Sequence, residues 1–332
     1  SNGRATSRVA IRSGAKNLRR LGMPKSVCSD EDFIGLFTQF GAAQTARKLG
    51  VTDRGVFNRR RRLEKKYDKP IHSPATVPTE YHPNRQTMNI ENGVVLVGSD
   101  AHYWPDIVST AHRGFVMACE MLKPKIVVMN GDAFDGASVS RHPPNGWEST
   151  PTVEEEINAC TERLGEIQSA AKGAKLVWTL GNHDARFEAR LASVAPEFAG
   201  VAGLHLSDSF PDWIHCWSLW LNDETVIMHR WKGGVHATHN NTAGSGKSMV
   251  TGHLHSLKVT PYSDYNGTRY GVDTGTMAHP WGPQFQYAMD TPRNWRSGFA
   301  ALTFVDGRLM WPEVFHVIDE GMIEFRGKIY EV

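Results

Sequence analysis

Short apolar runs recur along residues 93–251, and each one gives way to Gly, Asn or His. Runs of this length, rich in Val, Ile and Leu, are typical of buried strands. We predict five of them, at Val94–Val97, Ile126–Met129, Leu176–Leu180, Thr225–Met228 and Met249–Thr251. Polar residues grouped after strands suit an α/β fold, in which ligands gather beyond the carboxyl ends of the strands.

Residues 30–67 show a helical period instead. From residue 30 the apolar positions recur at helical spacing until Gly41 ends the helix; these positions are Phe33, Ile34, Leu36, Phe37 and Phe40. A short Ala-rich helix then stops at Gly50, a residue suited to a left-handed C-cap. Thr52 or Asp53 caps a further helix that runs to about Tyr67.

The last two of these helices resemble a helix-turn-helix, with Ala46 at the close approach, Gly50 in the turn and Val56 in the core. The final helix would contact DNA through its basic residues, which are Arg54, Arg59, Arg60, Arg61, Arg62 and Lys65. One position departs from the motif, because Arg59 stands where an apolar residue is usual. The alternative is a three-helix bundle for oligomerisation, with solvated arginines.

Charge separates the two parts of the chain. Residues 1–69 hold 17 Lys and Arg against 6 Asp and Glu, a net charge of +11, whereas the remainder holds 20 against 29, a net charge of −9. A basic module suggests a polyanionic partner, and DNA is the partner we expect. We predict a basic flexible arm at 1–27, a helix-turn-helix-like nucleic-acid-binding domain at 28–67, a Pro-containing linker at 68–90 and a catalytic domain at 91–332.

The composition favours a cytoplasmic protein. No hydrophobic stretch is long enough to span a bilayer, and no secretory signal pattern opens the chain, so we expect no membrane partner. The four cysteines lie far apart and form no C-x-x-C pair, which argues against a disulfide framework and a zinc ribbon. The sequence also allows the protein to form a homo-oligomer.

Five short motifs follow the predicted strands in a fixed order. They are Asp100-Ala101-His102, Gly131-Asp132-Ala133-Phe134-Asp135, Gly181-Asn182-His183-Asp184, His229, and Gly252-His253-Leu254-His255. Carboxylate, carboxamide and imidazole groups together suit a borderline divalent ion such as Mn, Fe, Zn or Ni. Each string alone recurs by chance, but the ordered set predicts a metal site.

The ordered set resembles the calcineurin-like metallophosphoesterase superfamily over roughly residues 93–332, the larger part of the chain. The resemblance implies an α/β fold, a four-layer αββα sandwich with helices outside two packed sheets. It implies two divalent ions in the cleft at the strand ends, for which Mn²⁺ is our first expectation and Fe, Zn or Ni are alternatives. It also implies phosphoester hydrolysis by in-line attack of a hydroxide that bridges the ions.

The same resemblance assigns seven metal ligands. Asp132 would bridge both ions; the first ion would also take Asp100, His102 and His255, and the second Asn182, His229 and His253. In the pairs with one intervening residue, the period of extended chain would place both ligands on one side of the backbone. A single histidine at 229 is hardly a motif, so His215 is its competitor.

The third motif also carries the resemblance to a catalytic histidine. His183 would protonate the leaving oxygen or steady the transition state, and Asp135 would orient it. Asp184 is an alternative partner for His183, and equally suits a structural cap.

Loops after the motifs suggest substrate contacts. Four of their basic residues would grip phosphates that flank the scissile bond, although ordinary solvated surface is the alternative for each; they are Arg141, His142, Arg230 and Lys232. The stretches 136–150 and 278–297, rich in Pro, Gly and Trp, would form cleft walls or an oligomer contact.

The basic module in front of the motifs makes a DNA nuclease, a metal-dependent phosphodiesterase, our favoured function. The alternative is a phosphatase or phosphodiesterase acting on small nucleotides or phosphoproteins, with the first module regulatory or dimerising. A DNA-binding regulator with a vestigial metal site is disfavoured, because the ligand set is complete.

Overall fold

The computed structural model of the chain describes residues 27–73, 84–143, 146–147 and 149–332. The chain divides into two compact units between residues 80 and 81; unit 1 precedes this point and unit 2 follows it. The division falls within the predicted linker at 68–90, but its predicted end is wrong, because a strand at Arg85–Met88 already belongs to a sheet of unit 2. The predicted basic arm lies outside the described residues up to residue 26, as do residues 74–83 of the linker.

Unit 1 contains two helical segments, α1 (Asp30–Leu49) and α2 (Asp53–Tyr67). α1 is broken at Gly41, whose φ of 71° and ψ of −178° are not helical, so the predicted end of the first helix is confirmed. Gly50 follows in the left-handed conformation, and its N–H donates hydrogen bonds to the carbonyls of Ala46 and Arg47 in the last turn of α1. The predicted C-cap is therefore confirmed.

A capping side chain sets the start of α2. The hydroxyl of Thr52 accepts a hydrogen bond from the N–H of Gly55 at 3.2 Å, which satisfies a donor that the first helical turn leaves unpaired. α1 and α2 then bury one common apolar cluster, made of Phe33, Phe37, Ala46, Val56, Leu63 and Ile71.

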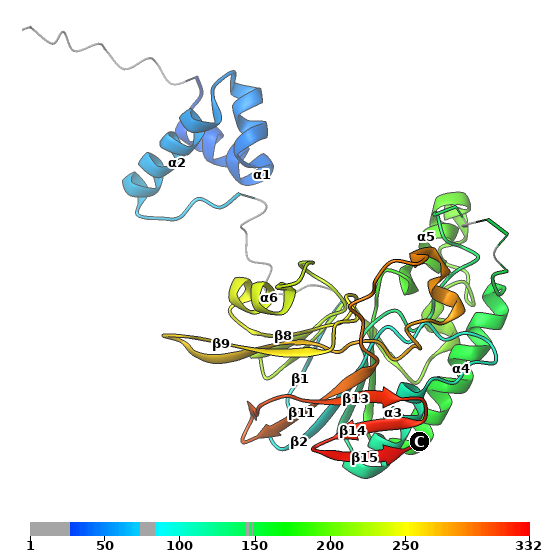
Figure 1. The fold of residues 1–332 in the computed structure, drawn as a ribbon. Helices are drawn as coiled ribbons and strands as arrows, with labels where there is room; N and C mark the ends of the chain where they lie inside the picture. Colours follow the sequence, from blue (N-terminus) through cyan, green and yellow to red (C-terminus); the bar gives the residue numbers. More distant parts are fainter. Residues whose placement is uncertain (1–26, 74–83, 144–145, 148) are drawn as a thin grey trace, which may run out of the picture. The chain divides into compact units, whose positions relative to one another are not determined.

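Unit 2 is built on two β-sheets (Figure 1). Sheet A has the order β1-β6-β7-β8-β10-β9, with β1 at Arg85–Met88, β6 at Ser218–Leu221, β7 at Thr225–Ile227, β8 at Ser248–Thr251, β9 at Lys258–Asp264 and β10 at Gly267–Asp273. Sheet B has the order β15-β14-β13-β11-β2-β3-β4-β5, and β12 pairs with β11. Its strands are β2 (Gly93–Gly98), β3 (Ile126–Met129), β4 (Lys175–Thr179), β5 (Ile214–Cys216), β11 (Gly298–Val305), β12 (Arg308–Leu309), β13 (Glu313–Asp319), β14 (Met322–Phe325) and β15 (Lys328–Glu331).

Helices cover the outer faces of both sheets. They are α3 (Thr110–Leu122), α4 (Val153–Ala170), α5 (Asp184–Val194) and α6 (Ala237–Ser245), with short 3₁₀ helices η1 (Pro196–Phe198), η2 (Leu206–Ser209) and η3 (Pro283–Ala288). α3 packs on sheet B and on α4, whereas α6 packs on β8, β9 and β10 of sheet A. No helix in the described part of the chain is long and apolar enough to cross a membrane.

The period of two along the strands of sheet B explains the layers. Val95 and Val97 of β2 face sheet A and join one apolar cluster with its strands, whereas Leu96 between them joins the cluster under α3 and α4. Val128 and Val127 of β3 divide in the same way. The order helices, sheet B, sheet A, helix confirms the predicted four-layer αββα arrangement.

The strands predicted from apolar runs are all present, with ends that differ by a residue or two. β2, β3 and β4 are parallel neighbours in sheet B, and β7 and β8 are parallel neighbours in sheet A. Their carboxyl ends therefore open at the same edge of the two-sheet stack, and each of the five motifs follows one of these strands.

Candidate metal centre

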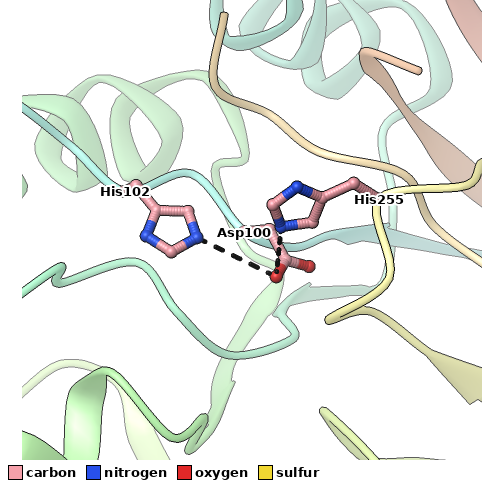
Figure 2. A group of neighbouring side chains, drawn as sticks. All are labelled: Asp100, His102 and His255. Carbon is pink, nitrogen blue, oxygen red and sulfur yellow. Dashed lines mark hydrogen bonds and ion pairs between the residues drawn. The ribbon is translucent and has the colours of Figure 1, made fainter. Parts of the chain in front are cut away.

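The first ligand cluster joins Asp100, His102 and His255 (Figure 2). The Nε2 of His255 lies 3.0 Å from Oδ1 of Asp100, and the Nε2 of His102 lies 4.0 Å from the same oxygen. All three side chains are buried, and each offers a donor atom within 4.8 Å of the others. The resemblance implied these residues as ligands of the first ion.

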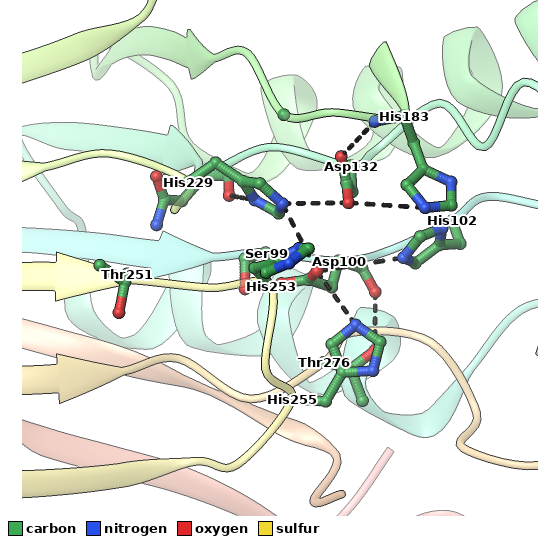
Figure 3. Close-up of polar contacts among 12 residues, drawn as sticks. Ser99, Asp100, His102, Asp132, His183, His229, Thr251, His253, His255 and Thr276 are labelled. Atoms are coloured by element: carbon green, nitrogen blue, oxygen red, sulfur yellow. Dashed lines mark hydrogen bonds and ion pairs between the residues drawn. The ribbon is translucent and has the colours of Figure 1, made fainter. Parts of the chain in front are cut away.

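The second cluster joins Asp132, His229 and His253 and lies beside the first (Figure 3). The Nε2 of His229 is 3.0 Å from Oδ2 of Asp132 and 4.0 Å from Oδ1 of Asp100, so one imidazole faces the carboxylates of both clusters. Asn182 follows β4 and lines one cavity together with His229. His215 lies outside both clusters, with its ring 5.3 Å from that of Trp178, and this placement favours His229.

The ligand pairs are not extended, so that part of the prediction is wrong. Positive φ angles occur at five of the seven predicted ligands, namely Asp100 (53°), His102 (41°), Asp132 (53°), His253 (71°) and His255 (55°). Each residue lies past the end of its strand, where the chain turns. The left-handed region costs a residue with a Cβ about 1–3 kcal/mol and persists where surrounding contacts impose it.

Two glycines make room for the carboxylates. A Cβ on Gly252 would stand 2.5 Å from Oδ2 of Asp100, and a Cβ on Gly181 would collide with Oδ1 of Asp132. In the turn that contains Gly252, the N–H of the next residue, His253, donates a hydrogen bond to Oδ2 of Asp100 at 2.8 Å. These two glycines therefore allow the backbone to approach the carboxylates of Asp100 and Asp132 closely.

Asp135 orients two histidines at once. Its Oδ1 accepts hydrogen bonds from Nδ1 of His102 at 2.7 Å and from Nδ1 of His183 at 3.0 Å. The Nε2 of His183 then lies 4.0 Å from Oδ2 of Asp132. Burial lowers the pKa of His183, but the hydrogen bond to Asp135 and the charge of Asp132 outweigh it, so the pKa is raised.

Asp184 accepts hydrogen bonds from backbone N–H groups and does not orient His183. Its two oxygens accept from the N–H groups of Asp132 (2.8 Å), Phe134 (3.1 Å) and Gly181 (2.7 Å) and from the indole of Trp178 (3.0 Å). These bonds tie the second motif to the third, so the structure supports the interpretation of Asp184 as a structural cap.

Glu156 is a supporting residue that the motifs did not reveal. It is buried on α4, and its carboxylate accepts from the N–H groups of Gly136 (2.6 Å) and Ala137 (2.9 Å), directly after Asp135. Burial and the charge of Asp135 raise its pKa to about 7. Its distance of twenty residues from the second motif gave no sequence signal for this contact.

The carboxylates of the two clusters stay ionised. Burial raises the pKa of Asp100, but the imidazoles of His255 and His229 outweigh it and lower the pKa to about 2. The pKa of Asp132 is also lowered, because the charge of His229 and its contact outweigh burial. Two buried carboxylates kept ionised side by side require cationic neighbours.

Buried oxygen and nitrogen atoms that have no hydrogen-bond partner are suited to bind divalent ions. Within the described residues, Oδ1 of Asn182 and Nε2 of His229 are buried without a hydrogen bond, and the 3.0 Å approach of His229 to Asp132 lacks hydrogen-bond geometry. Such atoms are costly unless a partner satisfies them. With the carboxylates and imidazoles of both clusters, they form a set of oxygen and nitrogen donors suited to borderline divalent metals.

A cavity of about 810 Å³ opens beside the second cluster. Three of the four predicted substrate contacts line it, namely Arg141, His142 and Arg230. Lys232 does not: it lines a smaller pocket next to His253, with its ammonium 4.6 Å from the ring centre of Trp231. The larger cavity also contains Arg186, a basic residue after the third motif that the sequence already suggested as a phosphate contact, and Arg190 and Trp217, which were absent from the predicted site. The spacing of Arg186 and Arg190, four residues apart after the third motif, could have suggested a shared helix face.

The stretch 278–297 walls the first cluster. The ring of Phe285 lies 5.0 Å from that of His102 and 5.5 Å from that of His255, and the ring of Trp295 lies 4.5 Å from that of His255. Arg293 ties the stretch together by donating to the carbonyls of Phe285 and Pro280. Of the two roles predicted for this stretch, the structure supports a cleft wall.

The predicted nucleic-acid contacts of unit 1 divide into two groups. Arg54, Arg61, Arg62 and Lys65 are exposed on the face of α2 opposite the buried Val56 and Leu63. Arg60 is half-buried beside Glu64, 3.5 Å away.

Arg59 does not belong with the predicted nucleic-acid contacts of α2. Its guanidinium donates to the carbonyls of Cys28 (2.8 Å) and Ser29 (3.0 Å), pairs with Asp30 at 3.2 Å, and lies 4.6 Å from the ring centre of Phe33. These contacts occupy it inside unit 1, because the position that departs from the motif faces the start of α1. We therefore remove Arg59 from the proposed DNA contacts.

The ligands thus lie just past the carboxyl ends of β2, β3, β4, β7 and β8, in the order that their sequence pattern suggested. Comparisons with known proteins assign no family to this chain. No protein-family model and no curated protein matches it.

Solved structures with some similarity include three proteins. Wild-type Vps29 from Entamoeba histolytica, in complex with Zn²⁺, has a TM-score of 0.36 and 14% identity over 72% of this chain and 98% of its own. YfcE, a phosphoesterase from E. coli, has a TM-score of 0.32 and 15% identity over 66% and 97%. A serine/threonine phosphatase from Saccharomyces cerevisiae similar to human PP5 has a TM-score of 0.35 and 11% identity over 72% and 85%.

Proposed function

We propose that unit 2 is a phosphoester hydrolase dependent on two divalent ions, and that the whole chain is a DNA nuclease. The observation that carries the hydrolase proposal is the pair of adjoining clusters, in which the buried His229 faces both Asp100 and Asp132. Mn²⁺ is the ion we propose first, since carboxylate, carboxamide and imidazole donors occur together.

Each ligand would keep the role that its cluster gives it. Asp100, His102 and His255 would hold one ion, His229, His253 and Asn182 the other, and Asp132 would touch both. When bound, the ions lower the pKa of water and neutralise charge on the phosphate oxygens. The five buried ligands, which are Asp100, His102, Asp132, His229 and His255, and the backbone hydrogen bonds around them would fix the geometry before the substrate arrives.

His183 would manage the proton of the leaving group. Asp135 accepts the hydrogen bond from its Nδ1, while Nε2 lies 4.0 Å from Oδ2 of Asp132 and accepts a hydrogen bond from Arg186 at 3.0 Å, which Arg186 would release when Nε2 carries a proton. Asp135 would therefore act as a positioning residue, and His183 as the group that holds or gives a proton at Nε2.

Unit 1 supports DNA as the substrate. Arg54, Arg61 and Lys65 recur at helical spacing on the exposed side of α2, and its N-terminal part starts at a capped turn, as in a helix that enters a DNA groove. The net charge of +11 on residues 1–69 would add a salt-dependent attraction for phosphates.

A phosphatase or phosphodiesterase acting on small nucleotides or phosphoproteins is the second candidate. Unit 1 exposes 42% of Phe57 and 38% of Val51, which would suit a protein contact and a regulatory or dimerising module. This candidate predicts that neutralising Arg61 and Lys65 leaves hydrolysis unaffected.

The deciding experiment incubates the protein with linear, circular and single-stranded DNA in Mn²⁺, and compares wild type with Asp132→Ala. The nuclease proposal expects cleavage by wild type and a loss in the variant. If no DNA is cut while the small diester bis(p-nitrophenyl) phosphate is hydrolysed, the nuclease proposal fails and the hydrolase proposal stands.

A further inference from the structure

The cavity beside the second cluster is lined by several arginines and by no carboxylate of the described residues. The four arginines are Arg141, Arg186, Arg190 and Arg230. They come from separate segments: the loop after β3, helix α5 and the loop after β7. Because residues 70–332 carry a net charge of −9, this concentration of guanidinium groups is a local exception in an acidic unit.

Three of these charges are not neutralised by the protein. Within the described residues, Arg141, Arg190 and Arg230 form no ion pair with a carboxylate, whereas Arg186 donates to the carbonyl of Asp135 at 2.9 Å and to Nε2 of His183 at 3.0 Å. Guanidinium groups that share one cavity repel one another unless an anion joins them. Phosphate suits them, because it accepts the paired donors of arginine.

Trp217 adds an aromatic surface to the same cavity. It stands between β5 and β6, where its N–H donates to the carbonyl of Asn84 at 2.8 Å and fixes the backbone. The side chain is 42% exposed. An exposed indole next to arginines is the combination on which single-stranded nucleic acids stack their bases.

The size of the cavity exceeds the needs of one phosphate. Its volume of about 810 Å³ lies within the range of roughly 300–1,000 Å³ typical of sites for whole small molecules. A phosphate monoester reacts at the ions and has no further charge to place, whereas a polynucleotide carries a second phosphate and a base next to the scissile bond.

We propose that this cavity binds the nucleotide adjoining the scissile phosphodiester of a nucleic-acid strand. Arg141, Arg190 and Arg230 bind the flanking phosphate, and the base stacks on Trp217. The inference rests on the proposed phosphodiesterase function and deepens it, because it makes the charge of the neighbouring linkage a determinant of cleavage. The strand is single or unpaired at this point, since a base that stacks on an indole cannot stay in the duplex.

The test uses the thymidine trinucleotide and two isomers, each with one linkage replaced by a neutral methylphosphonate. Each isomer keeps a single cleavable phosphodiester with an uncharged neighbour. The full-length protein is assayed in Mn²⁺ as wild type, Arg190→Gln and Arg141→Gln, with the exposed Arg308→Gln on β12 as the matched control. Bis(p-nitrophenyl) phosphate reports the reaction centre.

We expect each cavity variant to lower kcat/KM on the trinucleotide about tenfold, and to lower it several-fold less on the neutral isomers, because the lost contact is already missing there. Trp217→Leu lowers the trinucleotide rate and Trp217→Phe restores most of it. The control matches wild type on every substrate.

An equal loss on charged and neutral substrates, or no loss on either, overturns the subsite while leaving the phosphodiesterase proposal intact. If the wild type hydrolyses neither the trinucleotide nor bis(p-nitrophenyl) phosphate in any divalent metal, both proposals fall.

Discussion

The Nε2 of His229 on the sheet A side lies 3.0 Å from Oδ2 of Asp132 on the sheet B side. The Nδ1 of the same ring donates to the carbonyl of Asn130 at 2.8 Å, so the ring is fixed with its other nitrogen toward the carboxylate. The pair closes the gap between the two sheets at the candidate centre. A shared divalent ion would explain why their contact lacks hydrogen-bond geometry.

Replacement of His229 tests the less secure of the ligand assignments. We expect His229→Ala to weaken the binding of Mn²⁺ by at least about 10–100-fold, because a nitrogen donor of the second cluster is lost. Isothermal titration of chelator-stripped protein measures the affinity. His215→Ala is the matched control, since His215 lies outside both clusters. Equal effects of the two substitutions would contradict the assignment.

Asp184 is expected to govern stability. Asp184→Ala would leave four buried donors without an acceptor, and we expect a loss of at least about 3 kcal/mol in the free energy of unfolding of unit 2. Urea unfolding followed by tryptophan fluorescence measures it, because all ten tryptophans lie in residues 104–311. Asp212→Ala, at an exposed position, serves as the control. A shift no larger than that of the control would refute the capping role.

Glu156 is expected to make stability depend on pH. Burial and the charge of Asp135 raise its pKa from 4.5 to about 7 in the folded protein, so the unfolded chain ionises first as pH rises. The contribution of Glu156 is therefore greatest below pH 4.5 and declines up to about pH 7, by about 1.4 kcal/mol per unit of pKa shift.

Glu156→Gln should lack this decline. In metal-free protein, we expect the unfolding free energy of the variant minus that of the wild type to rise by about 2–3 kcal/mol between pH 5 and pH 8. Urea titrations at both pH values measure the change, with Glu154→Gln on the exposed face of α4 as the control. A difference that stays constant with pH would count against the raised pKa.

Neighbouring arginines of α2 should behave differently. Arg61→Ala is expected to weaken DNA binding and to reduce the slope of log affinity against log salt by about one unit, because one phosphate contact is lost. Arg59→Ala should instead loosen the start of α1, which its guanidinium holds through two carbonyls and Asp30.

Fluorescence anisotropy of a labelled duplex over a salt series measures the first effect, and hydrogen exchange of the α1 amides measures the second. An unchanged salt slope in Arg61→Ala, together with a lowered slope in Arg59→Ala, would reverse the interpretation of this helix.

Much of the fold followed from local patterns in the sequence. The apolar runs located β2, β3, β4, β7 and β8 because a strand buried on both faces needs an unbroken apolar segment. Gly41, Gly50 and Thr52 located helix ends because capping depends on the backbone freedom or side chain of a single residue. The order of the motifs after strands was enough to predict which residues meet.

Contacts between distant segments were beyond these patterns. Arg59 reads as one of a run of four exposed arginines until α1 places Asp30 beside it. Asp135 and Asp184 are both acids near His183, and only the turns after β3 and β4 show that one bonds imidazoles and the other bonds backbone. The arginine cavity depends on three segments that no local spacing relates.

Hydrolysis of bis(p-nitrophenyl) phosphate as a function of added Mn²⁺ measures whether unit 2 is a phosphoester hydrolase that needs two divalent ions. Chelator-stripped wild type should be inactive and should gain activity up to about two equivalents of metal, because both clusters must be filled. Asp132→Ala should remain inactive at every metal concentration. Activity without metal, or an Asp132→Ala variant as active as wild type, would contradict the account.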